Sequence, residues 1–476
     1  MAIQAPEGTK DLLPDEELFW LDFQQCAREV FGTYGYLPIE VPTIEQTELF
    51  VRGIGEATDV VSKEMFATFS GENLKKLLDG QSLKSKSRLS LRPEGTAGVV
   101  RAVVQHDLVP QGAAPVKLMY AGPMFRAERP QKGRLRQFHQ VGVECLGAEE
   151  PTIDAEAIIM LMRFYEKVGI PADKMTLLIN SMGCEKCRPA YRDAVRAYMD
   201  EHADELCETC NTRKEINPLR AFDCKNAGCA QVMEAAPKIS DHLCPDCKAH
   251  YDQVKAYLEA AGVAYQEDAK LVRGLDYYTR TVFEVQVDDG LGSHNAIGGG
   301  GRSDKLAEEV GGRPTPGLGF ALGYERCVLA LEAAGKEFPK AARCDVFIAC
   351  VDESVRLAAF RLMQACRDAG VTAEMDHQHR SLKSQFKLAD KVGSRMVAVL
   401  GPDELAAGQC TVRDMASHEE RKVALADVAQ DLAAALGLTE GHGDGCGCGC
   451  GCHDGECDCD GDCDCGDECT CGHHQH

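Results

Sequence analysis

Hydrophobic and polar positions in the C-terminal part of the chain fall into short apolar runs and amphipathic stretches. The apolar runs, which predict strands, are DVFIAC (345–350), VTAEMD (371–376) and RMVAVLG (395–401). The amphipathic stretches are VRLAAFRLMQACRDAG (355–370), SLKSQFKLADKVG (381–393) and EERKVALADVAQDLAAAL (419–436). Because strand and helix patterns alternate, residues 344–438 are predicted to form an α/β domain with a mainly parallel sheet, after a linker at 331–343.

The pattern upstream mixes the two kinds of element. Strands are predicted in KLMYAGPMF (117–125), RQFHQVGVECLG (136–147) and TVFEVQV (281–287), with helical patterns between them. This order favours an α+β domain over residues 1–330, built on an antiparallel sheet. Cysteines in pairs indicate a smaller domain, residues 170–265, inserted in the first.

Composition changes this picture at the C-terminus. Residues 441–476 contain ten Cys, ten Gly, nine acidic residues, five His, one Thr and one Gln. Residues 439–476 are therefore predicted to be a disordered tail. The tail carries minus 9 of the formal net charge of minus 23, so the body is also acidic, at minus 14. An acidic body argues against indiscriminate nucleic-acid binding, which needs a broad basic surface.

The N-terminus, MAIQAPEGTKDLLPDEE, has neither the basic nor the apolar segment of a secretory signal. No apolar run reaches membrane-spanning length. We therefore expect a cytoplasmic protein without a membrane partner. Cysteines stay reduced in the cytoplasm, and pairs of cysteines in cytoplasmic proteins are more often metal ligands than disulfides.

A strongly basic turn joins two of the predicted strands. Five positive charges fall within eleven residues of FRAERPQKGRLRQFHQVGVE: Arg126, Arg129, Lys132, Arg134 and Arg136. A turn this polar faces either water or a polyanion. Alternation places four residues on one face of the following strand: Phe138, Gln140, Gly142 and Glu144. A buried Gln and Glu need polar partners, which are either each other or a small polar ligand that Arg126 also reaches.

This segment resembles motif 2 of class II aminoacyl-tRNA synthetases, in the form found in histidyl-tRNA synthetases. YGYLPIEVPTIE, with Pro42, resembles motif 1, and PGLGFALGYER, ending at Arg326, resembles motif 3. SLRPEGTAGVVRA resembles the strand and turn that receive the substrate amino group. LVRGLDYYTRTVFEV and GGGGRSDKL resemble the two histidine-specific signatures, although Ser303 replaces the usual Tyr and puts the packing of that loop in doubt. With a C-terminal domain similar to the family's anticodon-binding domain, the resemblance covers nearly all of residues 1–438.

The resemblance implies a ligase that activates L-histidine with ATP and transfers the histidyl group to the 3' end of its tRNA, working as a homodimer through motif 1. Histidyl-adenylate and pyrophosphate are the products of the first step. No protein nucleophile is implied, because the histidine carboxylate attacks the α-phosphorus and arginines neutralise the developing charge. Arg126 and Arg273 would flank the α-phosphate and carboxylate, and Arg326 would hold the distal phosphates, with Mg²⁺ screening the pyrophosphate.

Recognition of histidine requires hydrogen-bond partners for its imidazole and ammonium groups. The resemblance assigns this task to Glu94, Gly95, Thr96, Arg126, Gln140, Glu144, Arg273, Tyr277 and Tyr278. Of these, Glu144 and Tyr278 suit the imidazole. Ordinary strand packing explains the two tyrosines as well, and adjacent strand positions would let only one of them touch substrate. Such hydrogen bonds reject analogues strongly enough that no editing domain is needed.

Two sets of basic residues are candidates for tRNA. Arg134 and Arg136 would reach the acceptor strand. Lys383, Lys387 and Lys391 recur every four residues on one predicted helix. This spacing suits phosphate contacts with the anticodon arm, and it suits a solvated helix face equally well.

Eight cysteines of the inserted segment have the spacing of metal ligands. They form four pairs: Cys184 and Cys187, Cys207 and Cys210, Cys224 and Cys229, and Cys244 and Cys247. They either complete two tetrahedral Zn²⁺ sites, in a pairing that the sequence leaves open, or are reduced core thiols. The tail either binds a soft metal such as zinc or copper(I) or is an extension of little consequence.

Two other classes of protein explain parts of the sequence. A regulatory paralogue of the same fold, such as the regulatory subunit of ATP phosphoribosyltransferase, typically lacks the adenylation residues and the anticodon domain. Both are present here. A metal-sequestration protein explains the tail but not the other 440 residues. The ligase is therefore the predicted function.

Overall fold

The computed structural model describes residues 3–56, 58–224, 226–272, 274–288, 290–291, 295–336, 338 and 344–438. The chain divides into two compact units, Met1–Pro339 and Lys340–His476. Arg273, the tail and part of the predicted linker, residues 337 and 339–343, lie outside the described residues. No described helix is long and apolar enough to span a membrane.

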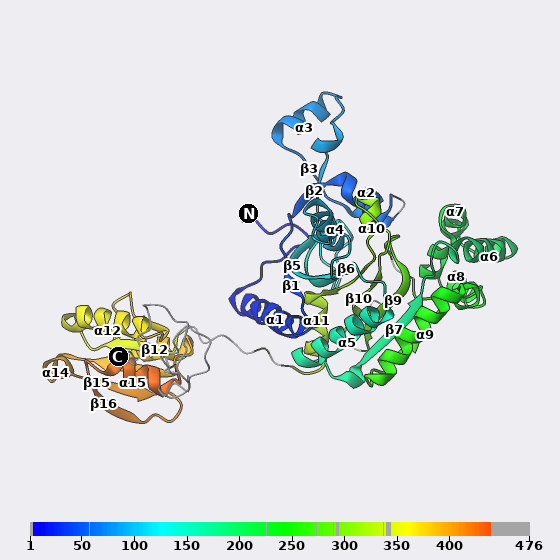
Figure 1. The fold of residues 1–476 in the computed structure, drawn as a ribbon. Coiled ribbons are helices and arrows are strands. Elements are labelled where there is room, and N and C mark those ends of the chain that lie inside the picture. The colour runs from blue at the N-terminus through cyan, green and yellow to red at the C-terminus, as the bar shows by residue number, and fades with distance from the viewer. Residues whose placement is uncertain are drawn as a thin grey trace, which may run out of the picture. The chain divides into compact units, whose positions relative to one another are not determined.

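An eight-stranded sheet organises the first unit (Figure 1). Its order is β1-β5-β6-β11-β10-β9-β7-β8, and only the short strands β1 and β8 at its two edges pair in parallel. The strands are β1 (Leu37–Pro38), β5 (Val116–Phe125), β6 (Gln137–Leu146), β7 (Met175–Ser181), β8 (Gln266–Glu267), β9 (Thr279–Val287), β10 (Ala296–Arg302) and β11 (Gly317–Gly323). The predicted antiparallel α+β class is confirmed.

Apolar residues on the two faces of this sheet enter two different cores. One face packs against α1 (Pro14–Gly32) and α5 (Pro151–Val168), through side chains such as Phe23, Phe31 and Phe164. The other face packs against α2 (Thr47–Ile54) and α4 (Thr96–Gln105). Burying one Phe or Val side chain stabilises the fold by about 1.5–3 kcal/mol, so the packing of both helix layers stabilises the sheet.

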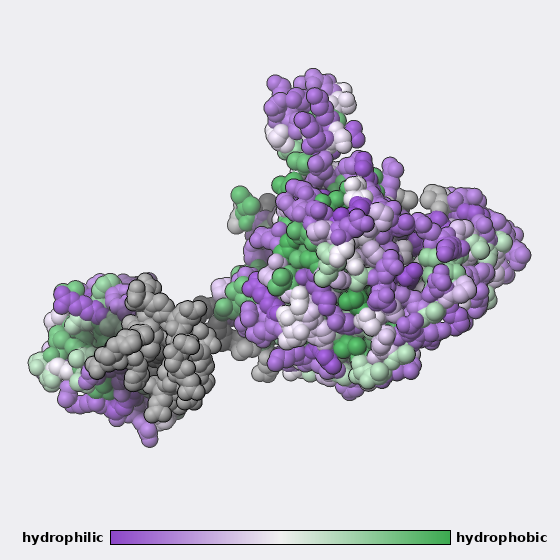
Figure 2. All heavy atoms as spheres, in the orientation of Figure 1, coloured by the Kyte–Doolittle hydropathy of each residue, from purple (hydrophilic) through white to green (hydrophobic). Residues whose placement is uncertain are grey.

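A small sheet and one projecting helix complete this part of the unit. The small sheet has the order β2-β4-β3, and its strands are β2 (Ile44–Gln46), β3 (Ala67–Thr68) and β4 (Leu89–Leu91). Helix α3 (Gly71–Leu78) has no buried residue and projects from the body in Figure 1. Its surface is largely hydrophilic (Figure 2), as expected of a helix with no core to join. Two further helices, α10 (Leu306–Glu309) and α11 (Tyr324–Ala333), flank β11.

The cysteine-paired segment forms a cluster of short helices. They are α6 (Arg188–Glu201), α7 (Glu208–Ile216), the 3-10 helix η5 (Pro218–Asp223), α8 (Ala227–Met233) and α9 (Pro245–Ala260). Because β7 pairs with β9 along its whole length, residues 175–181 belong to the large sheet. The inserted segment therefore begins after Ser181, later than the sequence indicates. Helix α9 packs against α5, where His250 and Asp154 form a buried hydrogen bond of 2.7 Å.

The second unit has a five-stranded sheet of order β13-β12-β14-β15-β16. Its strands are β12 (Val346–Cys350), β13 (Ala373–Met375), β14 (Met396–Leu400), β15 (Gln409–Asp414) and β16 (Glu420–Ala424). Its helices are α12 (Arg356–Asp368), α13 (Leu382–Lys391), α14 (Pro402–Ala406) and α15 (Val428–Ala435). The α/β class is confirmed, but "mainly parallel" is wrong, because two of the four pairings are antiparallel.

The error arose at the end of this unit. Residues 419–436 read as one amphipathic stretch, whereas the structure divides them into β16 and α15. Strand β16 lies at the sheet edge, and four of its five residues are exposed. Such a strand lacks the alternation of apolar and polar residues by which strands are recognised.

Candidate active site

A buried polar cluster forms where α4 begins beside β6. The Glu94 carboxylate accepts hydrogen bonds from the N–H groups of Thr96 and Ala97, at 2.7 and 2.9 Å. The Thr96 hydroxyl donates in turn to Glu144 on β6, at 2.6 Å. Glu94, Thr96 and Glu144 are 4, 8 and 1% exposed, so two carboxylates and a hydroxyl meet inside the protein. Burial of two carboxylates so close together is costly unless a cation or donors of a ligand join them.

Glycines make the space for this cluster. The ring of Tyr120 on β5 lies so close to Gly95 and Gly142 that a Cβ atom at either glycine would overlap it. Gly319 on β11 is paired with Glu144 and likewise has no room for a side chain beside that carboxylate. The sequence analysis missed Tyr120. Its signal was present, since a large aromatic residue pairs across the hairpin with Gly142.

Burial sets the protonation of the two carboxylates. It raises the pKa of Glu94, although hydrogen bonds from the backbone of Ala97 and Thr96 oppose this rise. Burial also raises the pKa of Glu144 well above its usual range. The hydrogen bond from Thr96 opposes that rise, and the charge of Glu94 adds to it. The site therefore tends to hold a proton that a cationic ligand would displace.

Gln140, Tyr277 and Tyr278 are further residues assigned to histidine that the structure describes. The Oε1 atom of Gln140 is buried and has no hydrogen-bond partner among the described residues. Tyr277 and Tyr278 are both buried, with ring centroids 4.6 Å apart. They lie in the turn before β9 rather than on the strand. The expectation that strand alternation would direct them to opposite faces is therefore wrong.

Arginines line an open cleft next to this pocket. Arg126 and Arg326 both face a cleft of about 880 Å³ and, with Gln140, a smaller cavity of about 220 Å³. The Arg126 Nε–H donates to the Pro93 carbonyl at 2.9 Å, and its guanidinium lies 5.4 Å from the centre of the Phe138 ring. The Arg326 Nε–H donates to the Gly133 carbonyl at 3.1 Å. Both guanidinium groups are thus oriented by backbone carbonyls.

The candidates for tRNA lie in two places. Arg134 forms an ion pair with Glu128 at 2.9 Å, and Arg136 donates to the carbonyl of Glu7 at 3.1 Å. These two contacts fix the position of the basic turn. In the second unit, Lys383, Lys387 and Lys391 are all exposed on α13.

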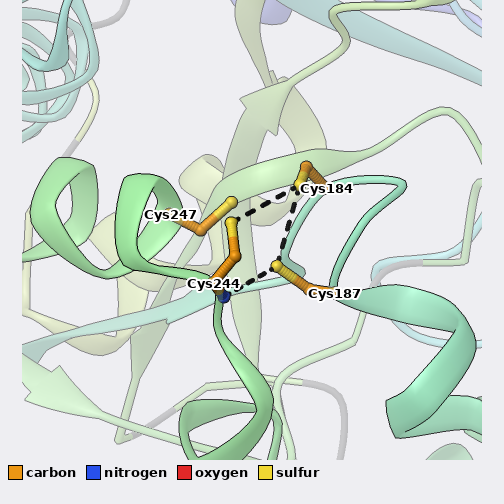
Figure 3. A group of neighbouring side chains, drawn as sticks. All are labelled: Cys184, Cys187, Cys244 and Cys247. Atoms are coloured by element: carbon orange, nitrogen blue, oxygen red, sulfur yellow. Dashed lines mark hydrogen bonds between the residues drawn. The ribbon is translucent and has the colours of Figure 1, made fainter.

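The eight cysteines form two groups of four. Cys184, Cys187, Cys244 and Cys247 converge from the segment after β7 and the start of α9 (Figure 3), and Cys207, Cys210, Cys224 and Cys229 form the other group. Within each group all sulfur atoms lie within 4.8 Å of one another, and no described cysteine is in a disulfide. Backbone hydrogen bonds lower the pKa of Cys207 to about 7, which favours the thiolate that binds metals. We call these groups the first and the second cysteine cluster.

Ser303, which replaces the usual Tyr of the second histidine-specific signature, is 2% exposed and tightly packed. Its N–H donates to the carbonyl of Gly317 at 2.8 Å. A Cβ at Gly317 would lie 2.9 Å from its hydroxyl oxygen, so the small side chain fits the close approach of the two segments.

Comparisons with known proteins agree over both units. A family profile described as histidyl-tRNA synthetase matches residues 8–327, and one described as anticodon binding domain matches residues 345–434. The histidine–tRNA ligase of Moorella thermoacetica is 46% identical over 428 residues, which are 90% of this chain and 97% of that protein. That of Anaeromyxobacter dehalogenans is 46% identical over 429 residues, 90% of this chain and 99% of that protein. The crystal structure of apo S. aureus histidyl-tRNA synthetase superimposes with a TM-score of 0.74 at 34% identity, covering 90% of this chain and all of that one.

Proposed function

Because this chain belongs to the histidyl-tRNA synthetase family and is a histidine–tRNA ligase, we propose that its buried polar cluster binds histidine and that its arginine-lined cleft binds ATP. The observation that carries this assignment is the chain of hydrogen bonds from Glu94 through Thr96 to Glu144. Glu94 supplies a counter-charge for the substrate ammonium group. Glu144 supplies an acceptor for an imidazole N–H, and the unpaired oxygen of Gln140 is a further acceptor beside them.

In the first step an oxygen of the histidine carboxylate bonds to the α-phosphorus, and the bond from that phosphorus to the bridging oxygen breaks to release pyrophosphate. Arg126 is held by Pro93 through Nε, so its two terminal nitrogens can bind the carboxylate and the α-phosphate together. Arg326 is held in the same way for the distal phosphates. Arg273 is proposed to share the role of Arg126, although it lies outside the described residues. Fixed guanidinium groups stabilise developing charge without reorganising.

In the second step the terminal ribose hydroxyl of the tRNA attacks the activated carbonyl and displaces AMP. Arg134 borders the cleft. We propose that Arg134 and Arg136, on the same basic turn, bind the acceptor end. Lys383, Lys387 and Lys391 are proposed for the anticodon arm, since exposed cations at one-turn spacing match the phosphate backbone. Charging of tRNA for translation also supports the cytoplasmic location expected from the sequence.

Metals would support this chemistry at separate places. Mg²⁺ prefers carboxylate oxygens and phosphates, and Glu284 lines the same cleft as the two arginines, so Glu284 would hold it on ATP. Each cysteine cluster offers four sulfur ligands, the set that suits structural Zn²⁺. A soft metal on the tail stays a prediction, because the tail lies outside the described residues.

A homodimer through motif 1 is proposed from the edge of the large sheet. Strand β1 is its first strand, and it pairs on one side only. Leu37 on β1 and Ile44 on β2 are 66 and 50% exposed. Exposed apolar residues beside an open sheet edge favour pairing with a second copy, which sedimentation of the full chain would test.

Histidine should be the one standard amino acid that drives exchange of labelled pyrophosphate into ATP. The reason is that the imidazole offers a ring N–H to Glu144 while the amino group reaches Glu94. Tryptophan, the other standard amino acid with a side-chain ring N–H, has a larger ring and no second ring nitrogen. An exchange assay with each amino acid in turn measures this. Exchange with a different amino acid, or none from folded protein, would reject the assignment.

The KM for histidine should fall as the pH rises through the raised pKa of Glu144. Burial keeps Glu144 protonated at low pH, and only the ionised carboxylate is a full acceptor for an imidazole N–H. Glu144→Gln should raise KM by roughly tenfold to hundredfold, the cost of one hydrogen bond to a charged group. The imidazole of free histidine itself titrates at about pH 6.5, so the pH profiles of the wild type and of Glu144→Gln are compared. Identical profiles would show that Glu144 does not titrate during binding.

A further inference from the structure

The loop before β9, residues 274–278, carries both tyrosines proposed for histidine, and residues of the inserted segment bind it. Arg188 on α6 donates from Nη2 to the carbonyl of Tyr278 at 2.7 Å. Arg220 on η5 donates from Nη2 to the carbonyl of Gly274 and to the carboxylate of Asp276, each at 3.1 Å. Two arginines of the insertion thus bind the loop at two points.

Each of these arginines lies close in sequence to the cysteines of one cluster. Arg188 directly follows Cys187 of the first cluster. The backbone next to Cys184 also pairs with the start of β9, directly after the loop. The Arg280 N–H donates to the Gly183 carbonyl at 2.9 Å, and the Met182 N–H donates to the Arg280 carbonyl at 2.6 Å. Arg220 lies between Cys210 and Cys224 of the second cluster, on a 3-10 helix of six residues. The position of either arginine therefore depends on the sulfur atoms around it.

The sulfur separations fit a shared metal ion. Cys184 and Cys187 are 3.7 Å apart, Cys184 and Cys244 are 3.9 Å apart, and so are Cys207 and Cys224. Four sulfurs placed tetrahedrally around Zn²⁺ at about 2.3 Å lie about 3.8 Å from one another, whereas a disulfide needs about 2 Å. Helices as short as α7 and η5 are not stable by themselves in water. Metal binding would supply the folding free energy that they need.

The second cluster also borders the ATP cleft. Cys207, Cys224 and Arg220 line the same cleft as Arg126 and Arg326. Side chains from the insertion thus reach both the histidine loop and the phosphate site of the same unit.

We propose that the two cysteine clusters are zinc sites that clamp the loop of residues 274–278, through Arg188 and Arg220, in the conformation that binds histidine. The clamp rests on the proposed function, because that loop is taken to carry the histidine-binding tyrosines. Arg188 and Arg220 are positioning residues for histidine, because they bind the loop that carries the tyrosines. The insertion thereby makes histidine affinity depend on bound metal.

The test uses the full chain with Arg220→Ala and Cys207→Ser/Cys224→Ser. Arg220→Ala should keep the zinc content of the wild type and raise the KM for histidine about tenfold, the loss of one charged hydrogen bond. It should also speed hydrogen exchange in the peptide covering residues 274–278. The double cysteine variant should lose one zinc per chain, measured as the difference from the wild type so that metal on the tail cancels, and show the same histidine defect.

Arg196→Ala is the matched control, because Arg196 also donates to a backbone carbonyl in the insertion, that of Lys214, but does not contact the loop. It should match the wild type in zinc, exchange and KM. Wild-type histidine KM and loop exchange in Arg220→Ala would overturn the clamp, and unchanged zinc in the cysteine variant would overturn the metal site. If the cysteine variant does not fold, Arg188→Ala takes its place for the clamp, and the zinc lost by the single variant Cys207→Ser, relative to the wild type, decides the metal. Failure of the proposed function has another signature, which is wild-type protein without histidine-dependent exchange.

Discussion

Arg126→Ala should lower the rate of histidine activation by about 10²–10³-fold, the loss seen when one preorganised group is removed from developing charge. Arg126 is already oriented in the free protein, by Pro93 through Nε and by the face of Phe138. Its charge therefore needs no rearrangement when the α-phosphorus is attacked. Single-turnover formation of adenylate, measured with saturating ATP and histidine, isolates this step from binding.

Arg126→Lys separates charge from geometry at the same position. Lysine keeps the positive charge but has no planar fork to hold a carboxylate and a phosphate together, so its rate should lie between those of the wild type and the alanine variant. An alanine variant within twofold of wild type would remove Arg126 from the chemistry.

Arg302→Leu should lower the free energy of unfolding of the first unit by about 3–5 kcal/mol, because it leaves a buried charge without its partner. Arg302 is fully buried and pairs with Asp154 at 2.5 Å and with Asp304 at 3.0 Å. The chain's single tryptophan, Trp20, lies in the core of this unit, so its fluorescence in urea follows this unit and not the other.

Arg361→Leu is the control for this measurement. Arg361 is exposed on α12 in the second unit, and its loss should leave the Trp20 transition where it is. A transition in Arg302→Leu that coincides with the wild type would mean that the buried pair contributes nothing to stability.

The antiparallel sheet was predictable because its central hairpin follows simple rules. Strands β5 and β6 carry apolar residues over ten positions each, and the basic turn between them is too polar to bury. The roles of Glu94, Arg126, Glu144 and Arg326 were predicted from the resemblance of their segments to the motifs of the family, and they stay predictions. The structure adds where the side chains lie: Arg126 and Arg326 line the cleft, and Glu94 and Glu144 are buried.

Other features depend on contacts that are distant in sequence. The grouping of the cysteines joins Cys184 with Cys244, sixty residues later, and spacing within each pair is the same for every grouping. Arg188 and Arg220 also lie far in sequence from the loop before β9, at separations of 90 and 54 residues, and each donates to a backbone carbonyl of that loop. Every residue has a backbone carbonyl, so a bond to a carbonyl does not depend on which residue carries it. No pattern in the sequence could therefore reveal these two contacts.

The tight fit of Tyr120 between Gly95 and Gly142 limits how this pocket can evolve. A larger residue at either glycine is blocked while the tyrosine is present, and a smaller residue at 120 alone opens a void beneath Glu144. The three positions are therefore expected to change together or not at all. Drift toward a different substrate would have to begin elsewhere, at the tyrosine loop or at Gln140, where one substitution can alter the pocket without a simultaneous second.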